Sequence, residues 1–310
     1  CYVVHGRRIN QTLISKTRLH HVASVAVAGL GVMGWWIAVN MKKAGHLKAV
    51  YNRTVAKAEE FSRQYGVKYV TDPKALFDEA DIVITMLSDS EAVSGFVRSV
   101  LDRVKGKVLV DMSTIHPSVS VSLAKEVEKN GGLMYDAPVI GTSVFAQQGK
   151  LTVLLGGPEA KRREVEEVLK ATAQNVIYIG PNGSGLYAKL VNNLMVGVYV
   201  AALAEALELG RKAGLSYDVI EKVLTQYTSA SPVTAGLKLP KMEKGDYSTQ
   251  FATKHMRKDL EIIQDEAKAL KVVTPLSSLA LQLYRLAEKL GYGELDYSSV
   301  KEVISGSGRK

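Results

Sequence analysis

Three glycines with the spacing Gly-x-Gly-x-x-Gly are the residues of this chain that most clearly indicate chemistry. They follow an apolar, β-rich segment over 22–28 and precede a helical pattern over 33–45. In a dinucleotide site the first glycine forms a tight turn, the second lets the backbone approach a pyrophosphate, and the third lets helix and strand pack closely. The N–H groups that begin the helix then face the phosphates. The run that predicts this cofactor site is Gly29, Leu30, Gly31, Val32, Met33 and Gly34.

The end of the next expected strand, over 47–51, indicates which dinucleotide binds. An Asp or Glu there usually bonds the ribose 2′-OH of NAD, whereas this chain has Asn52, Arg53 and Thr54, with no acid before Glu59. A guanidinium binds a 2′-phosphate through paired N–H donors, and Asn52 and Thr54 can add neutral hydrogen bonds. The alternative is that Arg53 is a solvated residue at a helix start. We expect NADP(H), with NAD(H) as the weaker alternative.

A long apolar helical pattern over 185–213 carries polar residues that share one face, Lys189 and Asn193. We expect Lys189 in the first turn, where burial and the helix N-terminus both lower the pKa of an amine, as a general acid/base requires. The spacing also fits a lysine whose amine reaches water, and spacing alone favours that alternative.

Two shorter segments carry weaker signals. The run 111–117 follows an expected strand at its carboxyl end, where ligands of open α/β sheets bind, but the hydroxyls of Ser113 and Thr114 can equally cap the next helix. Lys258 and Asp259 alone indicate no more than an exposed pair.

Strand and helix patterns alternate up to about residue 180, which predicts a doubly wound parallel α/β Rossmann sheet. The segment 138–149 is expected to be a connection that lines a cleft. Only long helical patterns follow the glycine-rich turn before residue 185. We therefore expect a basic extension over 1–21, an NADP-binding domain over 22–182 and a second, all-helical domain over 183–310. The expected strands cover 22–28, 47–51, 67–70, 81–87, 107–112, 133–136, 151–155 and 176–179.

The composition limits the functional classes. The 310 residues are 46% hydrophobic, which suits a soluble protein with a sizeable core. Much of the net charge of +9 lies in 1–21, which is a transit-like extension or an artefact of the start site; elsewhere Lys and Glu alternate, so we expect no nucleic-acid partner. Charged and amide residues interrupt the apolar region 186–209, so we expect no membrane span. With Cys1 as the only cysteine, we expect a cytoplasmic protein with no metal site.

The order of these motifs resembles that of the β-hydroxyacid dehydrogenase family, which includes 3-hydroxyisobutyrate dehydrogenases and glyoxylate/succinic semialdehyde reductases. The resemblance runs from about residue 24 to 303. It rests on the motifs at 29–34, 52–54, 110–117, 136–142, 149–152, 183–193 and 258–259.

The resemblance implies a role for each matching residue and an active site between the domains. Lys189 matches the catalytic lysine, and Asn193 matches an amide that holds the substrate. His116 is the nearest rival to Lys189 by motif position, and we expect it to face solvent. The remaining matches are Ser113 and Thr114 beside the nicotinamide and substrate, Leu87 and Ser88 along the nicotinamide ribose, and Lys258 closing over the cofactor.

One stretch departs from the family pattern. The family usually has Pro-Val-Ser-Gly-Gly where this chain has Pro-Val-Ile-Gly-Thr over 138–142. That stretch normally holds the substrate carboxylate with a hydroxyl and backbone N–H groups. Ile140 removes the usual hydroxyl, Gly141 is retained, and Thr142 supplies a hydroxyl two residues later.

The resemblance implies an oxidoreductase that transfers hydride between NADP(H) and a small carboxylate. The expected substrate is a 3-hydroxy acid, such as 3-hydroxyisobutyrate or serine, or its aldehyde, and the expected assembly is a homodimer or homotetramer built on the helical domain. A glyoxylate/succinic semialdehyde reductase is the alternative within the family. A catalytically silent NADP-binding module is the alternative of another class, and the basic N-terminal segment is its only support.

Overall fold

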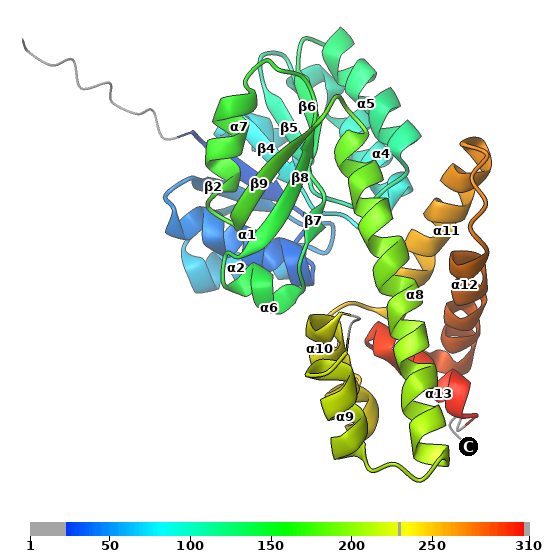
Figure 1. The fold of residues 1–310 in the computed structure, drawn as a ribbon. Helices are drawn as coiled ribbons and strands as arrows, with labels where there is room; N and C mark the ends of the chain where they lie inside the picture. Colours follow the sequence, from blue (N-terminus) through cyan, green and yellow to red (C-terminus); the bar gives the residue numbers. More distant parts are fainter. Residues whose placement is uncertain (1–22, 229–230, 307–310) are drawn as a thin grey trace, which may run out of the picture.

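The computed structural model describes residues 23–228 and 231–306, so the basic extension expected over 1–21 lies outside the described residues. Within them, the first domain is built on a sheet of nine strands in the order β3-β2-β1-β4-β5-β6-β8-β7, with β9 paired to β8 (Figure 1). The strands are β1 Val25–Ala28, β2 Leu47–Tyr51, β3 Lys68–Val70, β4 Ile82–Thr85, β5 Val108–Asp111, β6 Leu133–Asp136, β7 Val139–Ile140, β8 Leu151–Gly156 and β9 Ala173–Gly180.

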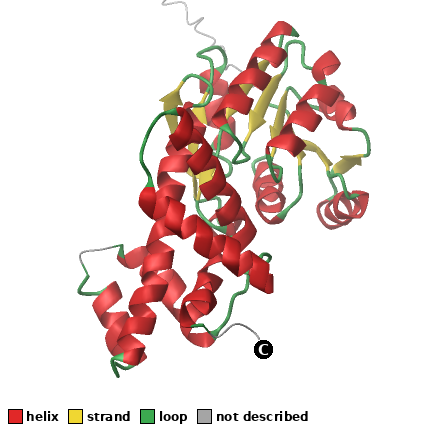
Figure 2. Ribbon diagram, turned by 90° about the vertical axis from the view of Figure 1, so that its right-hand side faces the viewer, coloured by secondary structure: helices red, strands yellow, loops and turns green. Residues whose placement is uncertain are grey.

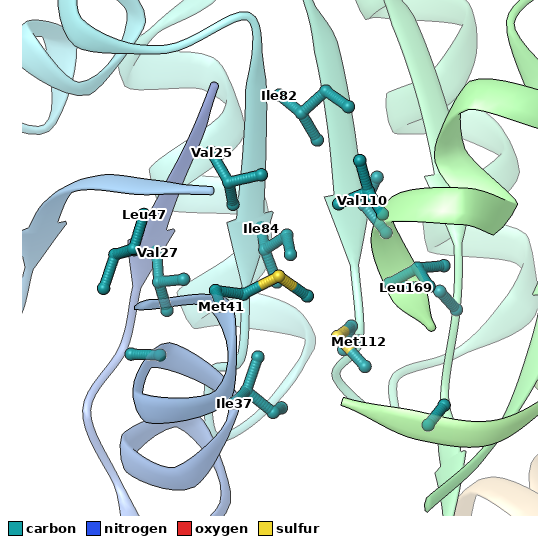
Figure 3. Packing of buried hydrophobic residues seen from close by; sticks show 14 of the residues in the cluster. Val25, Val27, Ile37, Met41, Leu47, Ile82, Ile84, Val110, Met112 and Leu169 are labelled. Carbon is teal, nitrogen blue, oxygen red and sulfur yellow. The ribbon is translucent and has the colours of Figure 1, made fainter. Parts of the chain in front are cut away.

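Helices cover both faces of this sheet, because its central strands β1, β4 and β5 are buried at every position and are apolar except at the last residues of β4 and β5. In β1, Val25 and Val27 pack into one cluster with α1, and the alternate residues Ala26 and Ala28 pack into the cluster on the other face. Figure 3 shows Val25 and Val27 beside the labelled α1 residues Ile37 and Met41. The doubly wound α/β fold expected from the sequence is confirmed. The helices of this domain are α1 Val32–Lys43, α2 Val55–Tyr65, α3 Leu76–Glu79, α4 Ser90–Ser99, α5 Pro117–Lys129, α6 Ser143–Gln147 and α7 Arg162–Leu169, with 3-10 turns at Pro73–Ala75 and Leu101–Arg103.

The far edge of the sheet differs from the expected parallel arrangement. Strands β1 to β6 run parallel, but β8 is antiparallel to β6 and β7, and β9 runs parallel to β8. The segment 138–149 is more than a connection, since it contains β7 and α6. Strand β7 exists because Val139 and Ile140 pair with β8, a partner that a local pattern does not reveal.

The second domain is helical in every described element except one isolated bridge between Ala252 and Asp296 (Figure 2). Helix α8 has the length and apolar composition of a membrane span, and in this fold it is the central helix that α9 to α13 contact. The helices are α8 Ser184–Lys212, α9 Tyr217–Thr225, α10 Pro232–Lys244, α11 Thr253–Ala269, α12 Pro275–Ala287 and α13 Val300–Ser305, with a π-turn at Glu288–Tyr292 and a 3-10 turn at Tyr297–Ser299.

A buried carboxylate joins the two domains. Asp136, the last residue of β6, accepts hydrogen bonds from the backbone N–H groups of Gly183 (2.7 Å) and Leu186 (3.1 Å) at the start of α8. A side chain at Gly185 would lie 2.3 Å from the carbonyl oxygen of Leu154, so only glycine allows this close approach. The first turn of α8 is therefore fixed directly on the sheet.

We expect Asp136→Ala to lower the free energy of unfolding by about 1–3 kcal/mol, because two N–H groups lose a buried acceptor. Urea unfolding followed by circular dichroism measures this. The exposed Asp78, which lies 3.3 Å from Arg103, is the matched control. Its alanine variant should lose less than about 0.5 kcal/mol. Equal losses in the two variants would contradict a joining role for Asp136.

Candidate active site between the sheet and the helical domain

The three glycines of the fingerprint have different surroundings. Gly29 has a φ of +98°, and a Cβ atom there would lie 2.3 Å from the Met86 carbonyl oxygen; a Cβ at Gly34 would lie 1.9 Å from the Gly29 carbonyl oxygen. At Gly31 no atom lies within 4 Å of that position. The packing of the protein therefore requires the first and third glycines but not the second. Open space at Gly31, directly before α1, fits the approach of a phosphate to the backbone.

The start of α1 is suited to an anion. Gly31 is its N-cap and supplies no side-chain cap, and the first turn contains no acid. A cavity of about 360 Å³ lies beside this turn. Trp35 lines it and also packs against Phe61, with ring centroids 5.0 Å apart. The other residues that line the cavity are Leu30, Gly31, Val32, Trp36, Lys57 and Glu60.

The segment after β2 lies against the glycine turn. Asn52 accepts a hydrogen bond from the Leu30 N–H (2.9 Å) and donates one to the Thr54 carbonyl (2.9 Å). Its amide thus ties the turn to the β2–α2 loop. The side chains of Arg53 and Thr54 are exposed at the same edge of the sheet, where a ligand can reach them.

The loops that follow β4 and β5 are joined to each other. The Ser113 hydroxyl is 1% exposed; it donates to Asp111 Oδ1 (2.6 Å) and accepts from the Leu87 N–H (2.8 Å). Ser88 donates to Asp89 at 2.6 Å. The structure therefore places Ser113 within the protein's own hydrogen bonds, and leaves Thr114 partly exposed.

Lys189 is buried, which corrects the expectation from spacing that its amine reaches water. Its exposed fraction is 8%, and burial lowers the pKa of its amine to about 8, against the opposing charge of Asp259. The expected position also changes. Because α8 begins at Ser184, Lys189 lies in its second turn, so burial and not the helix N-terminus is the main cause.

A residue that sequence reasoning treated as half of an exposed pair is also buried here. Asp259 is 1% exposed; it accepts a hydrogen bond from Asn193 Nδ2 (2.6 Å), and its Oδ1 lies 3.1 Å from Lys258 Nζ. Lys258 in turn donates to the Thr114 carbonyl at 2.6 Å, across the two domains. The helical spacing of apolar residues on α11, with Met256 and Leu260 beside it, is the signal that could have placed Asp259 inward.

His116 does not simply face solvent as expected. Its imidazole is partly buried, with Nδ1 3.7 Å from Glu266 Oε1 and Nε2 3.8 Å from Asp265 Oδ2 on α11. Tyr187 donates to the same Glu266 side chain at 2.7 Å. His116 therefore belongs to the contact between the sheet and α11.

The stretch 138–142 contains β7, and the pairing of β7 with β8 fixes its path. Gly141 has a φ of +127°, and a Cβ there would lie 2.9 Å from the Leu151 side chain. Ile140 is partly buried, and Thr142 is the N-cap of α6 without a side-chain hydrogen bond to it. Within residues 23–228 and 231–306 no hydrogen bond is found between this stretch and Lys189 or Asn193.

Comparisons with known proteins find two family matches along the chain. Residues 24–180 match the family described as the NAD binding domain of 6-phosphogluconate dehydrogenase, and residues 183–304 match the family described as NAD-binding of NADP-dependent 3-hydroxyisobutyrate dehydrogenase. The mitochondrial 3-hydroxyisobutyrate dehydrogenase of Mus musculus is 37% identical over 292 residues, 90% of this chain and 86% of that protein.

Two further proteins are similar over most of the chain. The chloroplastic glyoxylate/succinic semialdehyde reductase 2 of Arabidopsis thaliana is 31% identical over 288 residues, 92% of this chain and 80% of that protein. The solved structure of the Mycobacterium tuberculosis 3-hydroxyisobutyrate dehydrogenase with L-serine has a TM-score of 0.82 at 29% identity, and the match covers 91% of this chain and 99% of that one.

The geometry of the glycine turn predicts opposite effects at its second and third glycines. Gly34→Ala should lower the free energy of unfolding by about 1–3 kcal/mol, because its Cβ overlaps the Gly29 carbonyl. Gly31→Ala should change it by less than about 1 kcal/mol, yet weaken NAD(P)H binding at least ~tenfold, because the methyl group occupies the ligand's approach. Urea unfolding and fluorescence titration with NADPH measure the two effects. Unchanged NADPH affinity in Gly31→Ala would place the pyrophosphate elsewhere.

Proposed function

The chain belongs to the family of 3-hydroxyisobutyrate dehydrogenases and glyoxylate/succinic semialdehyde reductases, NAD(P)-binding oxidoreductases that act on CH–OH groups, and we propose that it interconverts a small 3-hydroxy acid and its aldehyde with NADP(H). The observation that carries this proposal is the buried amine of Lys189, whose pKa of about 8 lies near neutral. A buried amine with such a pKa can both give and take a proton.

We assign the proton transfer to Lys189. Bound NADP(H) supplies or accepts the hydride. In the reductive direction the Lys189 ammonium gives its proton to the carbonyl oxygen of the substrate, and in the oxidative direction the neutral amine takes the proton of the hydroxyl group. Asp259 accepts a 2.6 Å hydrogen bond from Asn193, which lies one helical turn after Lys189 on α8. This bond orients the Asn193 amide for a substrate oxygen.

Arg53 and Thr54 are the groups that we assign to a 2′-phosphate. Both are exposed at the end of β2, and Asn52 fixes their loop to the glycine turn. The rest of the proposed cofactor site lies after the carboxyl ends of β4 and β5. It consists of Leu87, Ser88 and Thr114, with Lys258 closing over the cofactor.

The substrate in this proposal carries a carboxylate, held by the backbone of Gly141, the hydroxyl of Thr142 and the amide of Asn193. L-serine in the structure of the mycobacterial relative supports a small hydroxy acid. Ile140 gives the pocket an apolar side chain where a hydroxyl is usual, and the 31% identity to a glyoxylate/succinic semialdehyde reductase keeps small aldehydes as the second candidate substrates.

The proposed assembly is a homodimer or homotetramer formed through the helical domain, and the proposed location is the cytoplasm. Large apolar side chains on two helices support the assembly. On α8, Val191 is 70% and Met195 is 63% exposed; on α12, Leu276 is 68% and Leu279 is 62% exposed. Exposed apolar groups of this size are typical of interfaces.

A substrate panel tests the proposed reaction. The purified protein is incubated with NADP⁺ and 3-hydroxyisobutyrate, L-serine, 4-hydroxybutyrate or glycolate, and with NADPH and small aldehydes and keto acids, while absorbance at 340 nm is followed. We expect turnover with at least one 3-carbon or 4-carbon hydroxy acid. No change with any compound would favour a silent cofactor-binding module.

Cofactor choice gives the next prediction. NADP(H) should bind better than NAD(H) by about 1.5–3 kcal/mol, because hydrogen bonds to a charged group contribute that much. This corresponds to roughly ten- to a hundredfold in Kd. Arg53→Asp should abolish or reverse the preference, while Lys48→Asp, on an exposed position of β2, should leave it unchanged. Fluorescence titration with both cofactors measures this, and equal affinities in the unmodified protein would refute it.

Removal of the proposed acid/base should be more damaging than removal of its rival. Lys189→Ala should lower kcat by about 10²–10⁴, the usual contribution of a positioned proton donor, and leave the Kd of NADPH nearly unchanged, because the phosphates lie on the other domain. His116→Ala should cost less than about tenfold in kcat. A His116→Ala variant with a much larger loss of kcat than this, or a Lys189→Ala variant with normal kcat, would exclude this mechanism.

The pH dependence should differ in the two directions. Because the Lys189 ammonium is the donor in reduction, kcat/KM for the aldehyde should be level below pH 8 and fall above it. The neutral amine is the acceptor in oxidation, so kcat/KM for the hydroxy acid should rise up to pH 8 and then level. Two profiles that bend in the same direction near pH 8 would contradict the role of Lys189.

A further inference from the structure

Asp111 is a fully buried carboxylate at the end of β5 that the proposed mechanism does not use. Its Oδ1 accepts hydrogen bonds from Thr85 Oγ1 (2.8 Å), Ser113 Oγ (2.6 Å) and the Ser113 N–H (3.2 Å). Its Oδ2 is buried without a hydrogen-bond partner among the described residues. Burying a carboxylate with one unpartnered oxygen costs free energy, which makes Asp111 a candidate for a role beyond stability.

The hydrogen bonds of Asp111 connect the carboxyl ends of three strands. Thr85 is the last residue of β4, and the Ser113 hydroxyl that Asp111 accepts from also receives the Leu87 N–H at 2.8 Å. The Asp111 carbonyl accepts from Ala137, directly after β6, at 2.7 Å. One residue therefore sets the loops after β4 and β5 relative to each other and to the start of the 138–142 stretch.

These loops lie where the reactive half of a dinucleotide must extend. The pyrophosphate position is at the β1–α1 turn, and Asn52–Thr54 after β2 lie on one side of it. In the strand order β2-β1-β4-β5 the other half of the ligand must then pass over the ends of β4 and β5.

We propose that Asp111 is a positioning residue for hydride transfer, which orients the Ser113 hydroxyl so that it holds the Leu87 N–H and thereby fixes the two loops against which the nicotinamide half lies. The inference rests on the proposed function. It also changes the role expected for Ser113, since a hydroxyl that donates to Asp111 and accepts from Leu87 has its proton committed within the protein.

The charge of Asp111 suits this role. Burial raises its pKa to about 6, with a further increase from the charge of Asp136, so the carboxylate is the main form at neutral pH. An ionised acceptor forms a shorter and stronger bond with the hydroxyl than a neutral one does.

A double-mutant cycle of Asp111→Asn and Ser113→Ala tests the proposal. In each single variant we expect kcat to fall about 10- to 100-fold, the usual effect of a small misplacement of reacting groups. KM for the hydroxy acid and the Kd of NADPH, measured by fluorescence, should change less than about threefold on the same argument. The double variant should be no slower than the slower single variant, because both changes break one chain of contacts. Thr85→Val is the control: it removes a bond to the same oxygen but not the Ser113–Leu87 link, and kcat should fall less than about threefold.

Several outcomes would overturn the proposal. Normal kcat in Asp111→Asn, or additive losses in the double variant, would show that Asp111 does not act through Ser113. A Ser113→Ala variant with raised KM and normal kcat would instead assign Ser113 to direct substrate contact. If Asp111→Asn does not fold, the split between kcat and KM in Ser113→Ala decides between the two roles. An unmodified protein that turns over no substrate would instead refute the proposed function, and this inference with it.

Discussion

The hydrogen bonds between Asp136 and the first turn of α8 are the contact on which the candidate site depends. They fix the start of a rigid helix to the sheet, and Lys189 follows five residues later, at about 1.5 Å of rise per residue. Lys189 of one domain is thus held at a set distance from the glycine turn of the other. A flexible linker between the domains would leave that distance to chance, whereas a capped helix determines it.

Much of the fold follows from local patterns. Apolar runs such as Val25–Ala28 must be buried on both faces, and the helical periods between them place helices over those faces, so a parallel sheet results. The reversed direction of β8 and β9 and the short strand β7 do not follow, because each depends on a partner distant in the chain. A two-residue strand has no period of its own to detect.

The surroundings of the predicted site residues do not follow from the sequence, whereas their roles remain predictions. Spacing alone left Lys189 reaching water, because α11, whose Asp259 and Lys258 charges act on its amine, lies some seventy residues further along the chain. The same helix carries the buried Asp259 and contacts His116 through Glu266. These positions correct the expectations that Asp259 is exposed and that His116 faces solvent. Hydrogen-bond partners could not be predicted from local patterns either. The hydrogen bond from the Leu30 N–H to Asn52, for example, forms only when β1 and β2 are paired.

The bridge from Lys258 to position 114 ends on a main-chain carbonyl. Since every amino acid carries the same main-chain oxygen, a substitution at position 114 changes the side chain without removing this hydrogen bond between the domains. Only replacement of Lys258, or a change in the path of the loop, would remove this hydrogen bond. The contact between the loop after β5 and α11 therefore tolerates any side chain at position 114.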